Sequence, residues 1–581
     1  MNVLVPLAVG GAALLLGGRF YGRFLARRLG LDPARPTPAV ERPDGRDFVP
    51  TRAHVVFAHH FATIAGAGPI LGPTMAVLYG FAPAWFWIVL GAIFFGAAHD
   101  LAALFVSVRS GGRSMAEIAR ATLGGPGFTL FILFSLVMIV LVTSAFLSAT
   151  AISLTSAWPL AKLGLPADQT LLSTVAASDG TRLGVIGGIA STSVVLITAF
   201  SPVLGWLIRR GLPTVAAYGL AAALCAGSIV VGFHVPIRLD PQTWMIVLSV
   251  YVLLSAGLPV WLILQPRDFA NVQILYVGIA VLLGALVVGG IGGLEVAAPA
   301  ANLAEGTAKL GLVWPMLFIT VACGAISGFH CLVASGTSAK QIASEAHVKR
   351  IGYDAMLLES LLALCVLVAV AATLDFGDYR SLVFPADPAA KSNPILAFSL
   401  AVGRLLDGAF GLPAAYGTVF GILLVEGFVI TTLDSAVRLN RYLFEELWEI
   451  VLGREQVPRL MRHPWFNAGL SVGLMLFLGW TNAFAAIWPV FGSANQLLAA
   501  LSLVAVSAWL LRRGGAGLPL YTIVPAGAML ITTVASLVVL LPRYAGKAQW
   551  SLFVAAVALL VLAAGVVLVA VLARRGESRA T

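Results

Sequence analysis

Ionisable side chains inside long apolar stretches are the residues of this chain best suited to chemistry. At the centre of a membrane-spanning helix such a group costs roughly 2.5–3.5 kcal/mol on insertion scales, so each one needs a partner or a function. Carboxylates and imidazoles in this setting can take up and release protons as their surroundings change. The stretches contain His59, His60, His99, Asp100, His330, Glu426 and Asp434.

Glu426 has the most unusual position, in the middle of "GILLVEGFVITTLDSAV". A carboxyl group there is protonated, is paired, or faces a polar cavity, where it could exchange a proton. The alternative is a structural hydrogen bond to a serine, a threonine or the backbone of another helix. Asp434 precedes Arg438 by four residues, and this spacing predicts an ion pair along one helix face.

Proton coupling is therefore assigned first to Glu426 and then to a smaller group of histidines and one aspartate. His59 and His60 are adjacent and point to different faces of a helix, so at most one of them faces a cavity. Small and hydroxylated residues surround His330 and allow either close helix packing or cation ligation. The predicted proton-coupling residues are Glu426, His60, Asp100 and His330.

The stretch "HVVFAHHFATIAGAGPILGPTMAVLY", from His54 to Tyr79, is apolar enough to cross a bilayer but contains glycines and prolines at its middle. These residues continue a helix poorly, so the pattern predicts a broken transmembrane helix. Main chain freed in this way survives in a membrane only where it lines a cavity or is packed in protein. A ligand site and a packed kink are the two interpretations.

A second apolar stretch, Trp244 to Leu264, is interrupted in the same manner by Ser255, Gly257 and Pro259. Five spans separate the two interruptions, so the second enters from the opposite face, as in an inverted five-helix repeat. Amides at half-helix N-termini can hold a carboxylate. The predicted substrate-binding residues are Gly66, Ala67, Gly68, Gly72, Ser255 and Gly257.

Composition determines the class of protein that must position these groups. The 581 residues are 59% hydrophobic and 11% charged, with a mean hydropathy of +0.95. Apolar runs of helix length recur throughout, which excludes the alternating strands of a membrane barrel. We predict an all-α polytopic membrane protein of about 15 transmembrane helices with a five-plus-five inverted-repeat core and extra helices at both ends.

The chain is predicted to have three parts. Residues 1–53 form an N-terminal transmembrane helix and a basic cytoplasmic linker, residues 54–436 the transport core, and residues 437–581 a C-terminal extension of four membrane helices. The segment Pro394 to Leu406 is expected to lie on or re-enter from the outer face without crossing.

The net charge of +10 comes from basic residues scattered in short loops, which favours topology over nucleic-acid binding as its explanation. With the N-terminus outside and the C-terminus inside, about three quarters of the 36 lysines and arginines lie on the inner side. We expect the lipid bilayer as a partner and no nucleic acid, and the sequence leaves the oligomeric state open.

No cofactor or metal is predicted. The cysteines Cys225, Cys323, Cys331 and Cys365 lie in apolar stretches and are interpreted as small core residues. The glycines near Gly66 are not followed by the lysine of a P-loop. The histidines and Asp100 include suitable metal ligands, but no helix-spaced metal motif supports a metal site.

Several passages resemble the carbon starvation protein family. They include "AHHFATIAGAGPILGPTMA", "GAAHDLAALFVSVRSGGRSMAEIA", "TVACGAISGFHCLVASGTSAKQIASE" and "VEGFVITTLDSAVRLNRYLFEEL". The resemblance implies the inverted-repeat fold of the amino acid, polyamine and organocation superfamily. It also implies proton-driven import of peptides or pyruvate, induction under carbon starvation, and a place in the bacterial cytoplasmic membrane.

Three functions remain to be compared. The first is a secondary active importer of small carboxylate nutrients, peptides or pyruvate, coupled to protons and without enzymatic activity. The second is a membrane-embedded nutrient sensor that binds such ligands without transporting them. The third is an intramembrane metalloenzyme, which requires bound metal.

Overall fold

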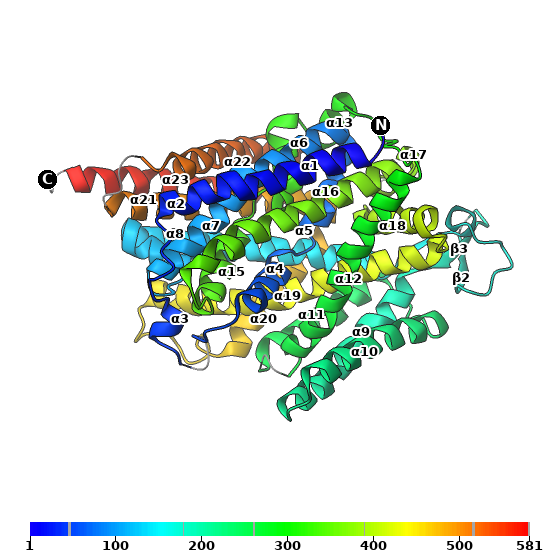
Figure 1. Cartoon of the computed structure of the whole chain (residues 1–581), viewed down its shortest axis with the longest axis horizontal. Coiled ribbons are helices and arrows are strands. Elements are labelled where there is room, and N and C mark those ends of the chain that lie inside the picture. The colour runs from blue at the N-terminus through cyan, green and yellow to red at the C-terminus, as the bar shows by residue number, and fades with distance from the viewer. Residues whose placement is uncertain (45–47, 178, 260–261, 388–389, 514–517, 579–581) are drawn as a thin grey trace.

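The computed structural model describes the whole chain except residues 45–47, 178, 260–261, 388–389, 514–517 and 579–581, and the side chains of residues 570–578. Long helices lie roughly side by side, and α1 begins at the end of the bundle opposite to the end of α23 (Figure 1). A small antiparallel sheet of order β1-β3-β2 covers the end where α1 begins. Its strands are β1 (Ala157–Pro159), β2 (Thr174–Ala176) and β3 (Arg182–Val185).

Within the described residues, twelve helical segments are long and apolar enough to span a membrane, or thirteen if one bent pair counts as a span. This confirms a polytopic all-α membrane fold. The number of fifteen, the repeat and the three-part division stay predictions. The long segments are α1 (Leu4–Leu16) with α2 (Gly22–Leu29), α6 (Phe81–Gly91) with α7 (Ala97–Arg109), α8 (Met115–Ser153), α9 (Gly187–Arg209), α10 (Thr214–His234), α12 (Leu264–Ile291), α14 (Phe318–Val321) with α15 (Phe329–Gly336), α16 (Ala355–Thr373), α19 (Ala414–Leu452), α21 (Phe484–Arg512), α22 (Leu520–Gly546) and α23 (Trp550–Ser578).

Shorter helices complete the bundle and its loops. The 17-residue α18 packs along α19, and its predicted failure to cross the membrane stays a prediction. The helix α19 continues past residue 436, so the predicted boundary of the core falls inside one helix. The shorter helices are α3 (Pro38–Glu41), α4 (Ala53–Ile64), α5 (Gly68–Ala76), α11 (Pro241–Gly257), α13 (Leu303–Leu310), α17 (Phe376–Val383), α18 (Pro394–Phe410) and α20 (Pro464–Thr481).

The predicted break in the first interrupted helix is confirmed. The α4 segment ends at Ile64, Ala65 leaves the helical region with ψ of 68°, and the following helical segment is inclined to α4 by 47°. Pro69 is the second residue of α5. A proline is tolerated there because the first amides of a helix have no intrahelical acceptor.

The second predicted interruption is a helix end instead. The α11 helix stops at Gly257, α12 begins at Leu264, and residues 260–261 of the predicted span lie outside the described residues. Pro266 falls in the first turn of α12, where its missing amide costs nothing. The prediction that Trp244 to Leu264 forms one span was therefore wrong. The pattern was ambiguous because glycine and proline terminate helices as well as interrupt them.

A different helix is interrupted beside the first break. The long segment Val313–Lys340 leaves the helix after Val321, where Ala322 has a φ of 44°, and becomes helical again at Phe329. We call residues 322–328 the α14–α15 break. The structure therefore places two interrupted helices, α4–α5 and α14–α15, in direct contact.

Glycines permit this close contact. A Cβ atom added at Gly68 would lie 2.6 Å from Cys323, and one at Gly72 would lie 2.4 Å from the Val321 carbonyl oxygen. Small residues bring membrane helices together because no side chain separates their backbones. Both glycines thus serve packing, which was one of the two interpretations of the interrupted stretch.

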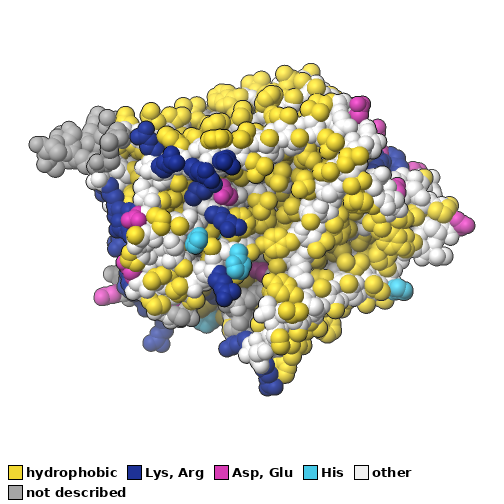
Figure 2. All heavy atoms as spheres, in the orientation of Figure 1, with side chains coloured by type: hydrophobic (Ala, Val, Ile, Leu, Met, Phe, Trp, Pro, Cys, Tyr) yellow, Lys and Arg dark blue, Asp and Glu magenta, His cyan; other side chains and the backbone are white. Residues whose placement is uncertain are grey.

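The surface has the charge pattern of a membrane protein. Hydrophobic side chains cover most of the face in Figure 2, and Lys and Arg side chains gather toward the end of the bundle where α2 and α3 lie. An apolar belt of this kind suits contact with lipid. The gathering of basic residues at one end is typical of a cytoplasmic face.

Candidate functional site

The centre of the bundle contains a linear chain of buried polar side chains. Asp100 on α7 joins two imidazoles: its Oδ2 lies 2.7 Å from Nδ1 of His330 on α15, and its Oδ1 lies 2.7 Å from Nδ1 of His99. All three side chains are 0% exposed. A carboxylate shared by two imidazoles can stabilise positive charge on either ring.

Two further residues extend the chain at its ends. Nε2 of His99 lies 2.6 Å from the Ser502 hydroxyl on α21, and Nε2 of His330 lies 3.3 Å from a carboxyl oxygen of Glu359 on α16. We call Ser502, His99, Asp100, His330 and Glu359 the histidine–carboxylate chain. Hydrogen bonds join Ser502, His99, Asp100 and His330, whereas Glu359 approaches Nε2 of His330 without a hydrogen bond. Because each imidazole can exchange a proton at either nitrogen, the hydrogen-bonded part can relay protons between α7, α15 and α21, with Glu359 of α16 at its end.

His60 adjoins this chain from the first interrupted helix. Its Nδ1 lies 2.8 Å from the Ser338 hydroxyl, and its Nε2 has no hydrogen-bond partner among the described residues. The side chain is buried, whereas His59 is exposed, so the two rings lie on different faces of α4 as predicted, and a cavity at His60 stays a prediction. Asp100 and His330 are close enough to His60 to act on its charge.

Helix α21 supplies the partners of the α14–α15 break. Oδ1 of Asn495 accepts a hydrogen bond of 3.1 Å from the Phe329 amide, and its backbone carbonyl accepts one of 3.1 Å from the Gly328 amide. The Trp488 indole donates to the Thr320 carbonyl at 3.0 Å. The freed backbone is therefore satisfied inside protein, as a membrane interior requires.

The first break retains free donors. The Gly66 amide donates to the Ile64 carbonyl at 2.8 Å, but the amides of Ala67 and Gly68 donate no hydrogen bond to a described residue. These two amides point from the start of α5, the positive end of its dipole. Of the predicted substrate-binding residues, Ala67 and Gly68 thus keep the chemistry required to hold an anion.

A second buried cluster lies between α11, α12 and α19. Nη1 of Arg267 lies 2.6 Å from Oδ2 of Asp434, which also accepts a hydrogen bond of 2.5 Å from the Tyr251 hydroxyl. Nη2 of Arg267 lies 3.0 Å from the Thr431 hydroxyl. The ion partner of Asp434 is therefore Arg267, and the predicted pairing with Arg438 was wrong.

Arg438 instead binds the end of α11. Its Nη2 donates to the carbonyls of Ser255 at 2.5 Å and Leu258 at 2.6 Å, while Gly257 packs against the Trp465 ring. The residues Ser255 and Gly257 thus belong to a helix C-terminus, which presents carbonyl oxygens and attracts cations. The prediction that Ser255 and Gly257 offer free amides to a substrate carboxylate was therefore wrong.

Glu426 lies apart from the histidine–carboxylate chain, to which no hydrogen bond or ion pair between described residues connects it. It is 0% exposed, and the hydroxyls of Thr150 and Ser153 on α8 are polar groups that interact with its carboxyl group. It borders a cavity of about 20 Å³ that Arg267 and Asn271 also line. A space of this size holds about one water molecule.

The family comparison covers almost the whole chain. The profile of the carbon starvation protein CstA family matches residues 2–391 and 383–536. The chain belongs to the CstA family. The sequence resemblance is thereby confirmed.

Relatives of this CstA-family chain are named as transporters. The peptide transporter CstA of Campylobacter jejuni is 30% identical over 89% of this chain and 77% of its own length. The peptide transporter CstA of Escherichia coli is 30% identical over 92% of this chain and 80% of its own length. The pyruvate/proton symporter BtsT of the same organism is 31% identical over 89% of this chain and 79% of its own length. The chain is a membrane transporter and has a non-enzymatic role.

Solved structures show only a distant likeness. MhsT in complex with L-phenylalanine has a TM-score of 0.48 and 13% identity, covering 89% of this chain and 100% of its own. A manganese transporter variant of Eremococcus coleocola has a TM-score of 0.48 and 11% identity, covering 93% and 97%.

The sequence did not predict two residues of this protein that the structure places in the two buried clusters. Glu359 lies in "IGYDAMLLES" near the start of a span, where it could be mistaken for a loop carboxylate. Arg267 lies in "LILQPRD", just after a predicted helix end. In both cases the available signal was a charged residue next to an apolar run.

No group of three His, Cys, Asp or Glu side chains in the described chain is arranged to hold a metal ion.

Proposed function

We propose that this protein is a secondary active importer of small carboxylates, peptides or pyruvate, driven by a proton gradient. The observation that carries the proposal is the histidine–carboxylate chain, whose titratable groups have 0% exposure and surround His330 on α15, one half of an interrupted helix. Intramembrane chains of this composition are typical of proton relays. Relatives named for peptide transport and for pyruvate/proton symport support the substrate class and the coupling ion.

Substrate and proton sites are proposed to meet at the first break. The free amides of Ala67 and Gly68 would hold the carboxylate that pyruvate and peptides share. His60 lies on α4, a few residues before these amides, and interacts with the charges of Asp100 and His330. A proton gained by the chain would increase its positive charge and so favour a bound anion nearby.

Gly66 and Gly72 complete the proposed substrate site by packing, and Glu426 is proposed as a second protonation site. A Cβ atom at Gly66 would lie 3.0 Å from the Thr432 hydroxyl on α19. The same helix contains Glu426, about one and a half turns earlier. Movement of α4–α5 against α19 would thus change the surroundings of both the substrate site and the Glu426 carboxyl group.

We also propose that the protein lies in the bacterial cytoplasmic membrane with its N-terminus outside. The end of the bundle where α2 and α3 lie carries the gathered basic side chains, and positive charge favours the cytoplasmic side (Figure 2).

Purified protein in liposomes tests the function. Labelled pyruvate and a labelled dipeptide are added with the outside acidic, at equal pH, and with the gradient collapsed by a protonophore. Accumulation of one ligand only under the inward proton gradient is expected. Binding without accumulation under all three conditions would contradict transport and favour the sensor.

A further inference from the structure

A basic cavity lies at the end of the bundle that carries α3, separate from the buried clusters described above. It has a volume of about 420 Å³, and five arginines and two glutamates line it, giving a net charge of +3. These are Arg35, Arg42, Arg109, Arg113, Arg513, Glu41 and Glu345.

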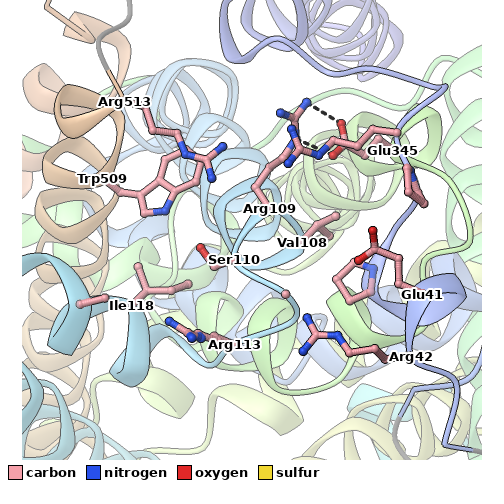
Figure 3. A pocket seen from close by; sticks show the side chains of 15 residues that line it. Glu41, Arg42, Val108, Arg109, Ser110, Arg113, Ile118, Glu345, Trp509 and Arg513 are labelled. Carbon is pink, nitrogen blue, oxygen red and sulfur yellow. Dashed lines mark hydrogen bonds and ion pairs between the residues drawn. The ribbon is translucent and has the colours of Figure 1, made fainter.

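Four distant segments of the chain line this cavity, and three of them supply its arginines. Arg35 and Arg42 flank α3 in the linker, Arg113 follows α7, and Arg513 follows α21. Figure 3 shows Arg42, Arg113 and Arg513 arranged around the opening, with Trp509 and Ser110 beside them. The fold therefore brings together charges that have no proximity in the sequence.

The wall of the cavity is fixed by hydrogen bonds. Arg109 forms a two-point contact with Glu345, at 2.5 Å and 2.8 Å, and its Nη2 also donates to the Gly30 carbonyl at 2.6 Å (Figure 3). Oε2 of Glu345, which accepts from Nη2 of Arg109, also accepts from the Asp32 amide at 3.0 Å. Both oxygens of Glu345 are thus hydrogen-bonded, and its ion pair is with Arg109.

The other arginines repel one another. No carboxylate in the described part of the chain lies within ion-pair distance of Arg35, Arg113 or Arg513. Burial and the positive charges of Arg35 and Arg109 lower the pKa of the Arg513 guanidinium from its ordinary value. Its guanidinium stacks 4.1 Å from the Trp509 ring centre, which holds it at the cavity edge.

We propose that this cavity is a binding site for a phosphate group. Guanidinium groups bind phosphate oxygens in pairs and are preferred over lysine for planar recognition. All five basic residues of the cavity are arginines. The positive-inside rule alone explains a positive charge at this face. It does not explain why arginines from three segments surround one cavity.

The phosphate can belong to a soluble metabolite or to an anionic lipid headgroup. In either case the ligand would tie the linker to the ends of α7 and α21, and α7 and α21 also contribute Asp100 and Ser502 to the histidine–carboxylate chain. Occupancy would thus be communicated to the centre of the bundle through two rigid helices.

The test compares wild type with the triple variant Arg35→Gln, Arg113→Gln and Arg513→Gln. A charge-matched control carries Arg210→Gln, Arg238→Gln and Arg459→Gln, three exposed arginines outside the cavity. The soluble arm measures the change in thermal unfolding temperature with inorganic pyrophosphate. The lipid arm uses native mass spectrometry to count phosphatidylglycerol and phosphatidylcholine retained from an equal mixture.

Wild type and control are expected to bind in one arm, and the cavity variant to bind at least about tenfold more weakly for each arginine removed. Stabilisation by pyrophosphate identifies a soluble ligand, and preferential retention of phosphatidylglycerol identifies a lipid. Equal binding by the cavity variant and the control, or no binding by wild type in either arm, would overturn the proposal.

Discussion

At the scale of single residues, the buried ion pair of Arg267 and Asp434 makes the clearest prediction. Replacing Arg267 by Met leaves the Asp434 carboxylate without its cation, and breaking a buried pair from one side costs about 3–5 kcal/mol. Replacing both residues, by Met and Leu, removes the Asp434 charge and should restore part of the loss, because Asp268, 3.5 Å from Nη2 of Arg267, still loses its cation. Denaturant unfolding in detergent micelles measures the three free energies.

Equal free energies of unfolding for the single variant and wild type would contradict this account of the pair. Tyr251 is kept in every variant, so its lost contact with Asp434 affects the double variant alone and limits the recovery.

At the residue scale, the sequence identified ionisable side chains inside apolar runs, and their role in proton coupling stays a prediction. Asp100, His330 and His60 were identified in this way, and the structure brings the first two into contact. Partners were harder to predict because they come from other helices. Spacing within one helix favoured Arg438 as the partner of Asp434, whereas the observed partner, Arg267, lies 167 residues away.

At the scale of helices, contact between the two interrupted elements depends on Gly72. A Cβ atom there would meet the Val321 carbonyl oxygen at 2.4 Å, and neither backbone can move freely. Gly72→Ala is expected to destabilise the protein by about 1–3 kcal/mol through overpacking. Thermal unfolding monitored by tryptophan fluorescence measures the change.

Gly473→Ala on α20 is the matched control, because a Cβ atom there meets nothing within 4 Å. This substitution should raise stability by about 0.5–1 kcal/mol, since alanine favours a helix more than glycine does. If both substitutions have the same effect, close packing at Gly72 is not what holds α5 against α14.

The side chain of Asn495 is predicted to stabilise the α14–α15 break. Asn495→Ala removes the acceptor of the Phe329 amide and leaves that buried donor unsatisfied, at a cost of about 1–3 kcal/mol. Asn495→Asp keeps this acceptor and should restore hydrogen-exchange protection at residues 328–330. Unchanged protection of these amides in Asn495→Ala would show that the break is held by other contacts.

The element scale is where sequence patterns failed most. Glycine and proline indicated the break before Gly68 correctly, but the same residue types at Gly257 and Pro259 mark a helix end. The α14–α15 break has no proline at its centre and was missed. Its irregular backbone is stabilised by Asn495 and Trp488 on α21, contacts that no local pattern can express.

At the scale of the whole molecule, the charge distribution predicts orientation. The native cysteines are all buried, so a new surface cysteine can be labelled against a low background. Thr174→Cys on β2 should react with an impermeant maleimide added to intact cells, and Arg459→Cys should react only after permeabilisation. The opposite labelling pattern would reverse the proposed topology.

The central claim is that protons are coupled to substrate through the histidine–carboxylate chain, and Glu359→Gln in liposomes tests it most directly. The substitution keeps size and removes the titratable carboxyl group that lies 3.3 Å from His330. The variant should exchange labelled pyruvate or dipeptide across the membrane while an internal pH dye reports no substrate-driven proton entry. Proton entry at the wild-type rate in Glu359→Gln, with its loss in Glu426→Gln, would contradict the account and assign coupling to Glu426.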